Sequence, residues 1–369
     1  MRGRELERVQ EELARLSCAG LESVAFRREA MHHIGRVVPS DAWCWTTADP
    51  STGLVTGAIG EGIPPDRSPR FFEIEYLVDD FNKFSDLACG PRPVGVLSEA
   101  TAGRLELSAR HREIFGPLGI GEDVRIALRI NSVCWGYLVL HRHPARPFKE
   151  EEVASLVSVA GQLATGLRLS LFQGSDASSV VGESGLLLLD GELNAVAITA
   201  AAERYLAAMQ SKQAYQPGRI PDAVRALVAS FLSTISADGA YMRSRVPAGN
   251  GGWLSLQATR LGAAGFGPLT AVIIERAGPT ELVPLVLQGS GLTDREAEVA
   301  GCVLRGQSTR EIASELSVSP QTVQQHLKSV FDKLGVRSRR EMLANLFLRH
   351  YWPRMATGTP IGANGWFAD

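Results

Sequence analysis

The last quarter of the chain contains three helix starts in close succession. Thr293 and Ser308 are each followed three residues later by a glutamate, which is the arrangement of a capping box. Ser319 comes directly before a proline, and proline is favoured at the first helical position because its missing N–H needs no partner there. Gly306 and Gly335 follow the first and third segments, where a left-handed residue commonly ends a helix. Short helices joined by a tight turn predict a helix-turn-helix.

The third segment has one apolar and one polar face. Its apolar residues recur at spacings of four, three and four, which predicts a buried stripe of Val323, Leu327, Val330 and Leu334. The opposite face carries Gln324, Gln325 and Lys328. Glutamine can pair bidentately with adenine, and lysine can reach guanine or a phosphate. A merely solvated face is the alternative, and the two preceding helices favour DNA over it.

Residues 290–350 resemble the C-terminal DNA-binding domain of LuxR/NarL-type transcription regulators. The matching pattern is Leu-Thr-x-Arg-Glu-x-Glu-Val, then Gly-x-Ser-x-x-Glu-Ile-Ala-x-x-Leu, and then Thr-Val-x-x-His-Leu through to Lys-Leu-Gly-Val-x-Ser-Arg. The resemblance covers about a sixth of the chain. It implies a sequence-specific regulator that binds double-stranded DNA, at an operator with two half-sites, as a homodimer. It also admits RNA polymerase as a partner.

The resemblance implies two sets of DNA contacts when it is carried over position by position. Phosphate contacts are expected from Thr309, Arg310, Ser319, Thr322, Arg337 and Ser338. Base contacts are expected from Gln324, Gln325 and Lys328, with Val323 reaching a thymine methyl group. The run from Ser338 to His350 is expected to form a fourth helix and the dimer contact, through Met342, Leu343, Leu346 and Phe347. The segment is only weakly basic, so specific binding is expected to need a dimer.

The whole chain has the composition of an ordinary globular protein. Its 369 residues predict two or three domains, and its net charge is −2. No apolar run reaches the length of a membrane span, and the charged N-terminus does not resemble a signal peptide. The cysteines are scattered, which favours a reducing cytoplasm over disulfides or a zinc site: Cys18, Cys44, Cys89, Cys134 and Cys302.

Residues 1–172 predict an antiparallel sheet framed by helices. Strands are expected over 43–47, 54–59, 124–130 and 133–141, with one buried face on the third because its apolar residues alternate with Arg125 and Arg129. Helices are expected over 71–84 and from Lys149 onward. This order of elements resembles an α+β GAF sensor domain. A heptad-like stripe over 5–17 and the long exit helix suit a parallel dimer.

A second module is expected over 181–278, after a polar linker at 173–180. Two strands meet at the Asp190-Gly191 turn, a helix follows from Ala200, and a hairpin over 253–275 ends the module. This order resembles an α+β PAS domain. With an all-α tetrahelical helix-turn-helix domain over 286–351, the predicted fold is multidomain.

Aromatic residues of the first module suggest a ligand site. One apolar cavity is expected to be lined by Trp43, Cys44, Trp45, Phe72, Tyr76, Phe81, Phe84, Trp135 and Tyr137. The alternative is that these residues form an ordinary core. Cys44 and Cys134 are candidates for a redox signal, although buried structural thiols are commoner.

The sequence contains no set of residues that predicts an enzyme. His32 and His33, and likewise His141 and His143, lack a third ligand at metal-binding spacing. No nucleophile–base pair or phosphate-binding loop is present. We therefore expect a regulator that is gated by an unknown small molecule or by a redox change. The sequence identifies no cofactor. The alternatives are front modules that bind a partner protein, and an acyl-homoserine-lactone receptor, which the second module and the chain length disfavour.

Overall fold

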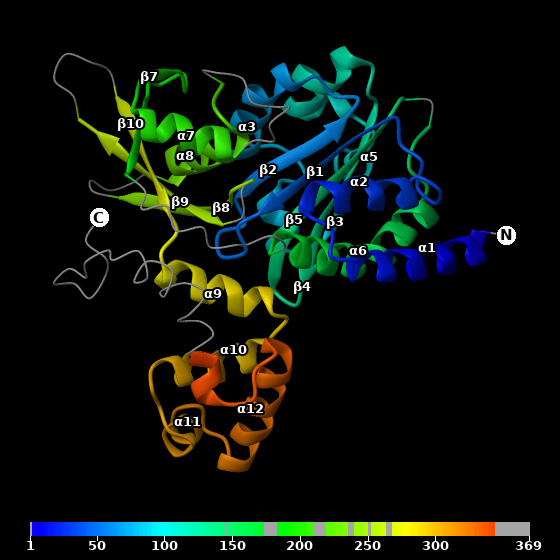
Figure 1. Cartoon of the computed structure of the whole chain (residues 1–369). Helices are drawn as coiled ribbons and strands as arrows, with labels where there is room; N and C mark the ends of the chain where they lie inside the picture. Colours follow the sequence, from blue (N-terminus) through cyan, green and yellow to red (C-terminus); the bar gives the residue numbers. More distant parts are fainter. Residues whose placement is uncertain are drawn as a thin grey trace. The chain divides into compact units, whose positions relative to one another are not determined.

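The computed structural model describes residues 2–144, 146–172, 183–209, 219–234, 240–249, 252–262 and 268–343. Contacts within the chain divide it into two compact units (Figure 1). One unit comprises Met1–Ser175 and Ser184–Arg276 and holds both sheets, and the other comprises Asp176–Glu183 and Ala277–Asp369. No helix among the described residues is long and apolar enough to cross a membrane.

The first sheet is antiparallel, with the strand order β2-β1-β5-β4-β3. Its strands are β1 (Ala42–Ala48), β2 (Val55–Glu61), β3 (Val94–Val96), β4 (Glu122–Ile130) and β5 (Val133–Arg142). The four strands predicted in this module are confirmed. The expectation that β4 buries only one face is wrong, because helices and loops cover both faces and Arg125 is buried.

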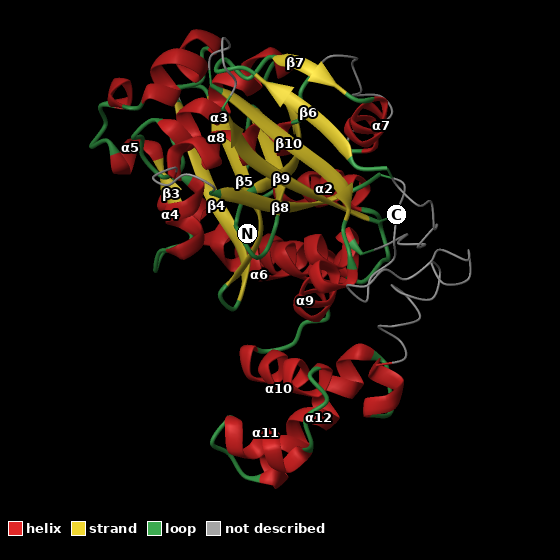
Figure 2. Cartoon of the chain, turned by 90° about the vertical axis from the view of Figure 1, so that its left-hand side faces the viewer, coloured by secondary structure: helices red, strands yellow, loops and turns green. Residues whose placement is uncertain are grey.

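Helices cover the two faces of this sheet (Figure 2). One face packs against α6 (Glu150–Leu171), which in turn contacts α1 (Arg2–Ser17) and α2 (Ser23–Ile34). The other face is covered by α3 (Ser68–Leu77), α4 (Phe84–Cys89), α5 (Leu97–Ala100) and four short turns of helix at Pro65–Arg67, Leu105–Leu107, His111–Phe115 and Gly116–Leu118.

The apolar stripe of α1 is buried within the chain. Val9 and Leu13 have no exposed surface, and α1 packs along α6. Leu156, Leu163 and Leu167 of α6 are buried in the same layer. Val9 and Leu13, at the centre of the stripe that suggested a seam between two chains, therefore build the core of the module itself, whereas Leu6 and Leu16 are half-buried.

The predicted helix over 71–84 is interrupted. It ends at Leu77, residues 78–83 have no regular structure, and α4 starts at Phe84. Asn82 has a φ of 52°, a left-handed conformation that a right-handed helix excludes and that asparagine tolerates better than most residues. Polar side chains in this interval bond to nearby backbone instead of extending the helix, as Asp80 does with the amide of Phe81.

The second sheet repeats the topology of the first. Its order is β7-β6-β10-β9-β8, which is the first order with five added to each strand number. The strands are β6 (Gly185–Leu189), β7 (Ala195–Ile198), β8 (Tyr241–Pro247), β9 (Trp253–Leu261) and β10 (Leu269–Arg276). The predicted strands and the helix α7 (Ala200–Ala208) are confirmed, whereas β8 and α8 (Asp222–Thr234) were not predicted.

Helix α8 belongs to the cores of both modules. It contacts β8, β9 and β10 of its own module, and α3 and β2 of the first. Leu227 packs in a cluster that includes Leu54 of the first module. Ala226, its neighbour, packs in the cluster around Tyr137 and Val139. The two sheets are thus joined by shared apolar burial.

A buried ion pair adds to this junction. Asp49, in the turn between β1 and β2, accepts hydrogen bonds from the backbone amide of Arg245 at 2.7 Å and from its Nη2 at 2.6 Å. The two side chains are 1% and 8% exposed. A charge removed from water needs a partner in good geometry, so this contact fixes the turn of one module against β8 of the other.

The C-terminal unit is helical. Its elements are α9 (Pro279–Gly289), α10 (Asp294–Leu304), α11 (Thr309–Glu315) and α12 (Pro320–Leu334). Val299, Ile312 and Val330 meet in its core. A further helix starts at Arg339 and is described as far as Leu343. The rest of the predicted fourth helix, including Leu346, Phe347 and His350, lies outside the described residues.

Candidate nucleic-acid interface and sensor face

The three predicted helix starts are confirmed. The Thr293 hydroxyl accepts from the Glu296 amide at 3.3 Å, and the Ser308 hydroxyl accepts from the Glu311 amide at 3.4 Å. Both glutamates accept from the amide of their cap residue in return. Ser319 caps α12 through the amide of Thr322 at 3.0 Å. These caps set the start of each helix independently of distant contacts.

Both glycines end their helices as predicted. Gly306 follows α10 with a φ of 80°, and Gly335 follows α12 with a φ of 66°. Both values lie in the left-handed region that glycine enters without a steric penalty. The lengths of α10 and α12 are therefore fixed by local sequence.

Helix α12 presents the predicted polar face. Gln324, Gln325 and Lys328 are exposed, whereas Leu327 and Val330 are buried. Gln324 and Lys328 also border a hollow that includes Phe331, Asp332 and Arg337. Side chains predicted to read bases thus lie beside one predicted to bind phosphate.

One predicted DNA contact is corrected. Val323 is fully buried and packs in the core with Ala300 and Ile312. Its methyl groups therefore have no surface to offer a thymine, and Val323 stabilises α12 instead. The helical wheel placed it on the buried stripe, and that placement is the one the structure supports.

The predicted phosphate-binding residues lie around the ends of α11 and α12. Arg310, Ser319, Arg337 and Ser338 are exposed, and Thr309 and Thr322 are half-buried. Ser319 and Thr322 share a hydrogen bond of 2.8 Å between their hydroxyls. Ser338 accepts from the Glu341 amide at 3.0 Å, which starts the fourth helix. Their contacts with DNA stay a prediction.

Arg339 is a structural residue that sequence reasoning missed. Its Nη2 donates to the Thr309 hydroxyl at 2.8 Å, and its Nη1 donates to the Gln307 carbonyl at 2.7 Å. The fourth helix is thereby tied to the start of α11. Arg339 and Arg340 follow Ser338 directly, and nothing in the sequence distinguishes their roles.

Glu296 links α10 to α12. Its carboxylate accepts from Ser329 Oγ and from Lys333 Nζ, each at 2.6 Å, in addition to the cap of its own helix. Burial alone raises the pKa of this carboxyl, but the bonds from Lys333, Ser329 and Thr293 outweigh it and lower the pKa to about 2. Its ordinary value is 4.5, so the ionised form stabilises the folded domain.

Glu296→Gln is expected to destabilise α10 and α12 by about 1–3 kcal/mol at neutral pH. The folded-state pKa lies below the unfolded one, so this contribution is complete above about pH 4.5 and disappears as the pH falls toward 2. Hydrogen exchange of the α10 and α12 amides, compared with wild type at each pH, would measure it. Glu311→Gln changes a capping glutamate that has no partner on another helix within the described part of the chain, so its effect should be smaller. Equal effects would contradict the role of Lys333.

The nine residues expected to line one cavity lie on two faces of the first sheet. Trp45 meets Phe26 of α2, with ring centroids 6.0 Å apart, and Trp135 meets Phe172 at 6.3 Å. Strand alternation places Trp43 with Trp45. These three tryptophans face the α2 and α6 layer. They do not line a site together with the other six.

The remaining aromatic residues lie on the opposite face. Phe72, Tyr76, Phe84, Cys44 and Tyr137 belong to one cluster. The rings of Phe84 and Tyr137 stack at 4.2 Å. Phe81 is half-buried in the irregular segment and is not part of this cluster.

Cys44 and Cys134, the two candidates for a redox signal, are poorly placed for that role. Burial raises the pKa of Cys44 to about 12 and that of Cys134 to about 11. The thiolate is the reactive form of cysteine, and it is disfavoured at both positions. Among the described residues, no group of three or more His, Cys, Asp or Glu side chains is placed to hold a metal ion.

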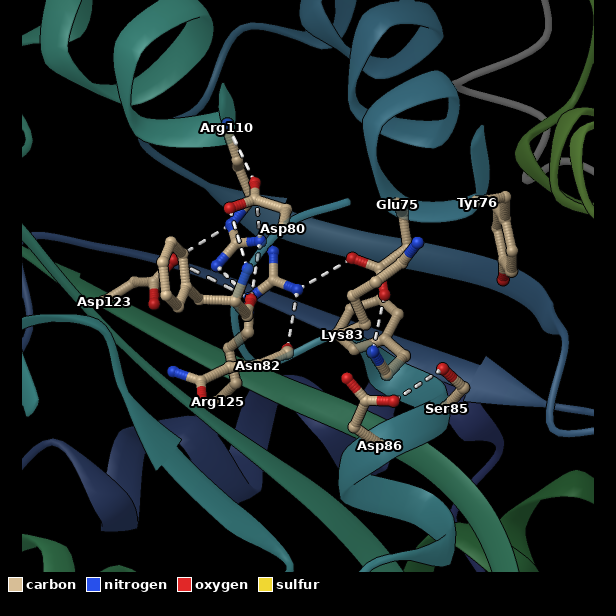
Figure 3. A network of polar contacts seen from close by, with 12 residues as sticks. Glu75, Tyr76, Asp80, Asn82, Lys83, Ser85, Asp86, Arg110, Asp123 and Arg125 are labelled. Atoms are coloured by element: carbon tan, nitrogen blue, oxygen red, sulfur yellow. Dashed lines mark hydrogen bonds and ion pairs between the residues drawn. The ribbon is translucent and has the colours of Figure 1, made fainter. Parts of the chain in front are cut away.

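The sequence did not predict a charged network that includes Glu75, Asp80, Arg110, Asp123 and Arg125 (Figure 3). It lies beside Phe84, whose ring stacks on Tyr137. Arg125 Nη1 donates to Glu75 Oε2 at 2.8 Å, and its guanidinium lies 4.8 Å from the centre of the Phe84 ring. Arg110 bridges Asp80 and Asp123, with N–O distances of 3.3 Å to each. All five charged side chains are at most 1% exposed. Alternation in β4 suggested an exposed Arg125, and only the covering segment 78–83 and α3 bury it.

Comparison with known proteins gives a family match for the C-terminal unit. Residues 290–345 match the family described as bacterial regulatory proteins, luxR family. The C-terminal domain belongs to this family. The LuxR-family domain is similar to the HTH-type transcriptional regulator MalT of Yersinia pestis (strain Pestoides F), with 33% identity over 76 residues. That match covers 21% of this chain, and this chain spans 8% of the length of MalT.

Solved structures with some likeness to the front of the chain include two sensor domains. The GAF domain of a phosphoenolpyruvate-protein phosphotransferase from Coxiella burnetii is 18% identical and has a TM-score of 0.33, with 44% of this chain and 93% of that chain covered. The VqsR LBD domain from Pseudomonas aeruginosa is 17% identical, with a TM-score of 0.31 and coverage of 46% and 95%. At these TM-scores the likeness adds nothing to the fold described above.

Proposed function

We propose that the chain is a cytoplasmic, sequence-specific DNA-binding transcription regulator whose front modules gate operator binding in response to a small molecule. The observation that carries the proposal is the exposed face of Gln324, Gln325 and Lys328 on a capped helix of a LuxR-family domain. Glutamine and lysine can read base edges in the major groove. Arg310, Arg337 and the hydroxyls around them would hold the flanking phosphates.

The proposed complex is a homodimer on two half-sites. The DNA-binding segment is only weakly basic, so phosphate attraction to one domain gives weak affinity. Two domains on a two-fold symmetric operator would combine their base contacts. RNA polymerase is the partner through which a bound regulator would act on transcription.

Gating requires a free energy difference between two arrangements of the dimer. Helix α8 and the Asp49–Arg245 pair join the first module to the second. A change at the first sheet would therefore reach the second module through packed side chains. We propose this route as the link between effector binding and the spacing of the two α12 helices.

Selection of duplexes from a random pool by the intact chain tests the proposal. We expect enrichment of a two-fold symmetric site, with half-sites about one or two helical turns apart. The selection should be run at one fixed salt concentration, since affinity depends steeply on salt. Failure to enrich any site, both alone and with a small-molecule fraction of cell extract, would overturn the DNA-binding proposal.

A further inference from the structure

Five buried polar atoms on one face of the first sheet have no hydrogen-bond partner within the described part of the chain. They are Asn82 Nδ2, Asp123 Oδ1, Arg125 Nε, Arg125 Nη2 and His141 Nδ1; of these, Arg125 Nε lies 3.7 Å from Asp123 Oδ2 in an ion pair. Each such atom destabilises the folded state when it is left unpaired in the interior. The side chains of Asp123, Arg125 and His141 are at most 1% exposed. Several unpaired polar atoms close together indicate a site for a polar ligand.

Strand pairing brings these side chains together. Asp123 on β4 lies opposite His141 on β5, and Arg125 lies opposite Gly95 on β3. Residues paired in this way point to the same face of a sheet. The Asn82 amide lies over Gly95, because a Cβ added there would be only 2.4–2.9 Å from the amide atoms. A glycine on β3 and a left-handed asparagine are therefore both needed to seat this amide.

The unpaired atoms have complementary chemistry. Arg125 Nη2 and Asn82 Nδ2 are donors, and Asp123 Oδ1 is an acceptor. Burial lowers the pKa of His141 to about 4, so its ring is neutral near pH 7. The network holds two arginines against three acids, Glu75, Asp80 and Asp123. A guest that fits must offer an acceptor group to Arg125 and a donor group to Asp123.

We propose that this face binds a small zwitterion of the amino-acid class, with its carboxylate on Arg125 and Asn82 and its ammonium group on Asp123. The inference rests on the proposed function, for which it names the class of effector. An acyl chain would have to displace or cover five buried charged side chains. That cost disfavours the acyl-homoserine-lactone alternative.

Access to the face requires movement of residues 78–83. This irregular segment is held by Arg110, which donates to the Phe81 carbonyl at 3.2 Å, and by Arg125, which donates to the Asn82 carbonyl at 3.3 Å. A guest carboxylate on Arg125 Nη2 would lie beside the bond from Arg125 Nη1 to the Asn82 carbonyl. The segment lies between α3 and α4, and α3 packs against α8. The guest therefore acts where the two modules meet.

The test is the thermal stability of the full chain with each standard L-amino acid at about 1 mM, beside an N-acyl homoserine lactone as the apolar comparator. A ligand that binds the folded state raises Tm. We expect at least one amino acid to raise Tm by about 2 °C or more, and the lactone to leave it unchanged. Calorimetric titration with the amino acid that gives the largest shift then supplies a dissociation constant.

Two glycine variants locate the site. Asn82→Gly keeps the left-handed backbone and removes the unpaired amide, so the dissociation constant is expected to rise about tenfold. Asn131→Gly makes the same change at another left-handed asparagine, in the exposed β4–β5 turn, and should bind like wild type. Tm without amino acid should be close to wild type in both variants.

Three results would overturn the inference. They are the absence of any shift across the amino acids, a shift with the lactone alone, and equal binding by the two glycine variants. An operator selected by a chain that binds no amino acid would reject this inference and leave DNA binding standing. Binding of an amino acid by a chain that selects no operator would support this inference and reject the DNA-binding proposal.

Discussion

Replacement of Gln324, Gln325 and Lys328 together by alanine is expected to lower the affinity for the selected operator by at least about 100-fold. A good base contact contributes about 1–3 kcal/mol, and about 1.4 kcal/mol corresponds to a factor of ten. All three side chains are exposed on α12, so their loss should leave the thermal stability of the chain unchanged. Fluorescence anisotropy with labelled operator, at one salt concentration, measures the change.

Single variants distinguish the roles of the three residues. If Lys328 reads a base, Lys328→Ala should relax the preference at one operator position; if it binds a phosphate, the variant should weaken all sequences and lower the salt slope by about one. Glu298→Gln, on the exposed surface of α10, is the matched control and should bind normally. A triple variant with wild-type affinity would show that α12 does not read the operator.

Asp49→Ala is expected to destabilise the unit that contains both sheets by about 3–5 kcal/mol, because it removes the carboxylate from a buried ion pair. The pair is nearly inaccessible to solvent, with Asp49 also holding the backbone amides of Arg245 and Ser51 at 2.7 and 3.0 Å. Denaturant unfolding, followed by circular dichroism, measures the difference in free energy. The loss should appear in the transition of the sheets and not in that of the C-terminal unit.

A double-mutant cycle separates the ion pair from packing. Arg245→Met removes the charge and keeps an apolar side chain, and the Asp49→Ala, Arg245→Met double variant should be more stable than the sum of the two single losses predicts. Ser51→Ala removes a smaller contact of the same arginine and serves as the control. A cost below about 1 kcal/mol for Asp49→Ala, the range of an exposed pair, would contradict the structural role given to this contact.

The C-terminal domain was predictable because its signals are local. Each helix start depends on a hydroxyl and a partner within three residues, and each glycine end depends on one φ angle. The burial of α12 likewise follows from helical spacing alone. Val323 shows the difference. The helical wheel correctly placed it on the buried stripe, whereas the resemblance implied a contact with a thymine methyl group that its burial excludes.

The face of the first sheet that carries Arg125 and Tyr137 was less predictable because its environment comes from distant residues. Alternation in β4 could not reveal that α3 and residues 78–83 bury Arg125. Nor could it reveal the irregularity where Arg129 pairs with Cys134 and Leu128 pairs with Gly136. That extra residue puts Trp135 and Tyr137 on different faces, so aromatic residues close in sequence do not share a site. Helix α8, missed from the sequence, follows a segment without periodic signals.

Helix α8 also bears on how such a chain can be rearranged by recombination. An exchange at the linker between the two sheets would leave Leu54 and the β2 side of the first module without the helix that covers them. The donor segment would have to bring an α8 of matching shape, together with an arginine at the position of Arg245. Inheritance of the two modules as a pair is therefore easier than inheritance of either one. The LuxR-family domain differs in this respect, because its described core and helix caps are built from its own residues.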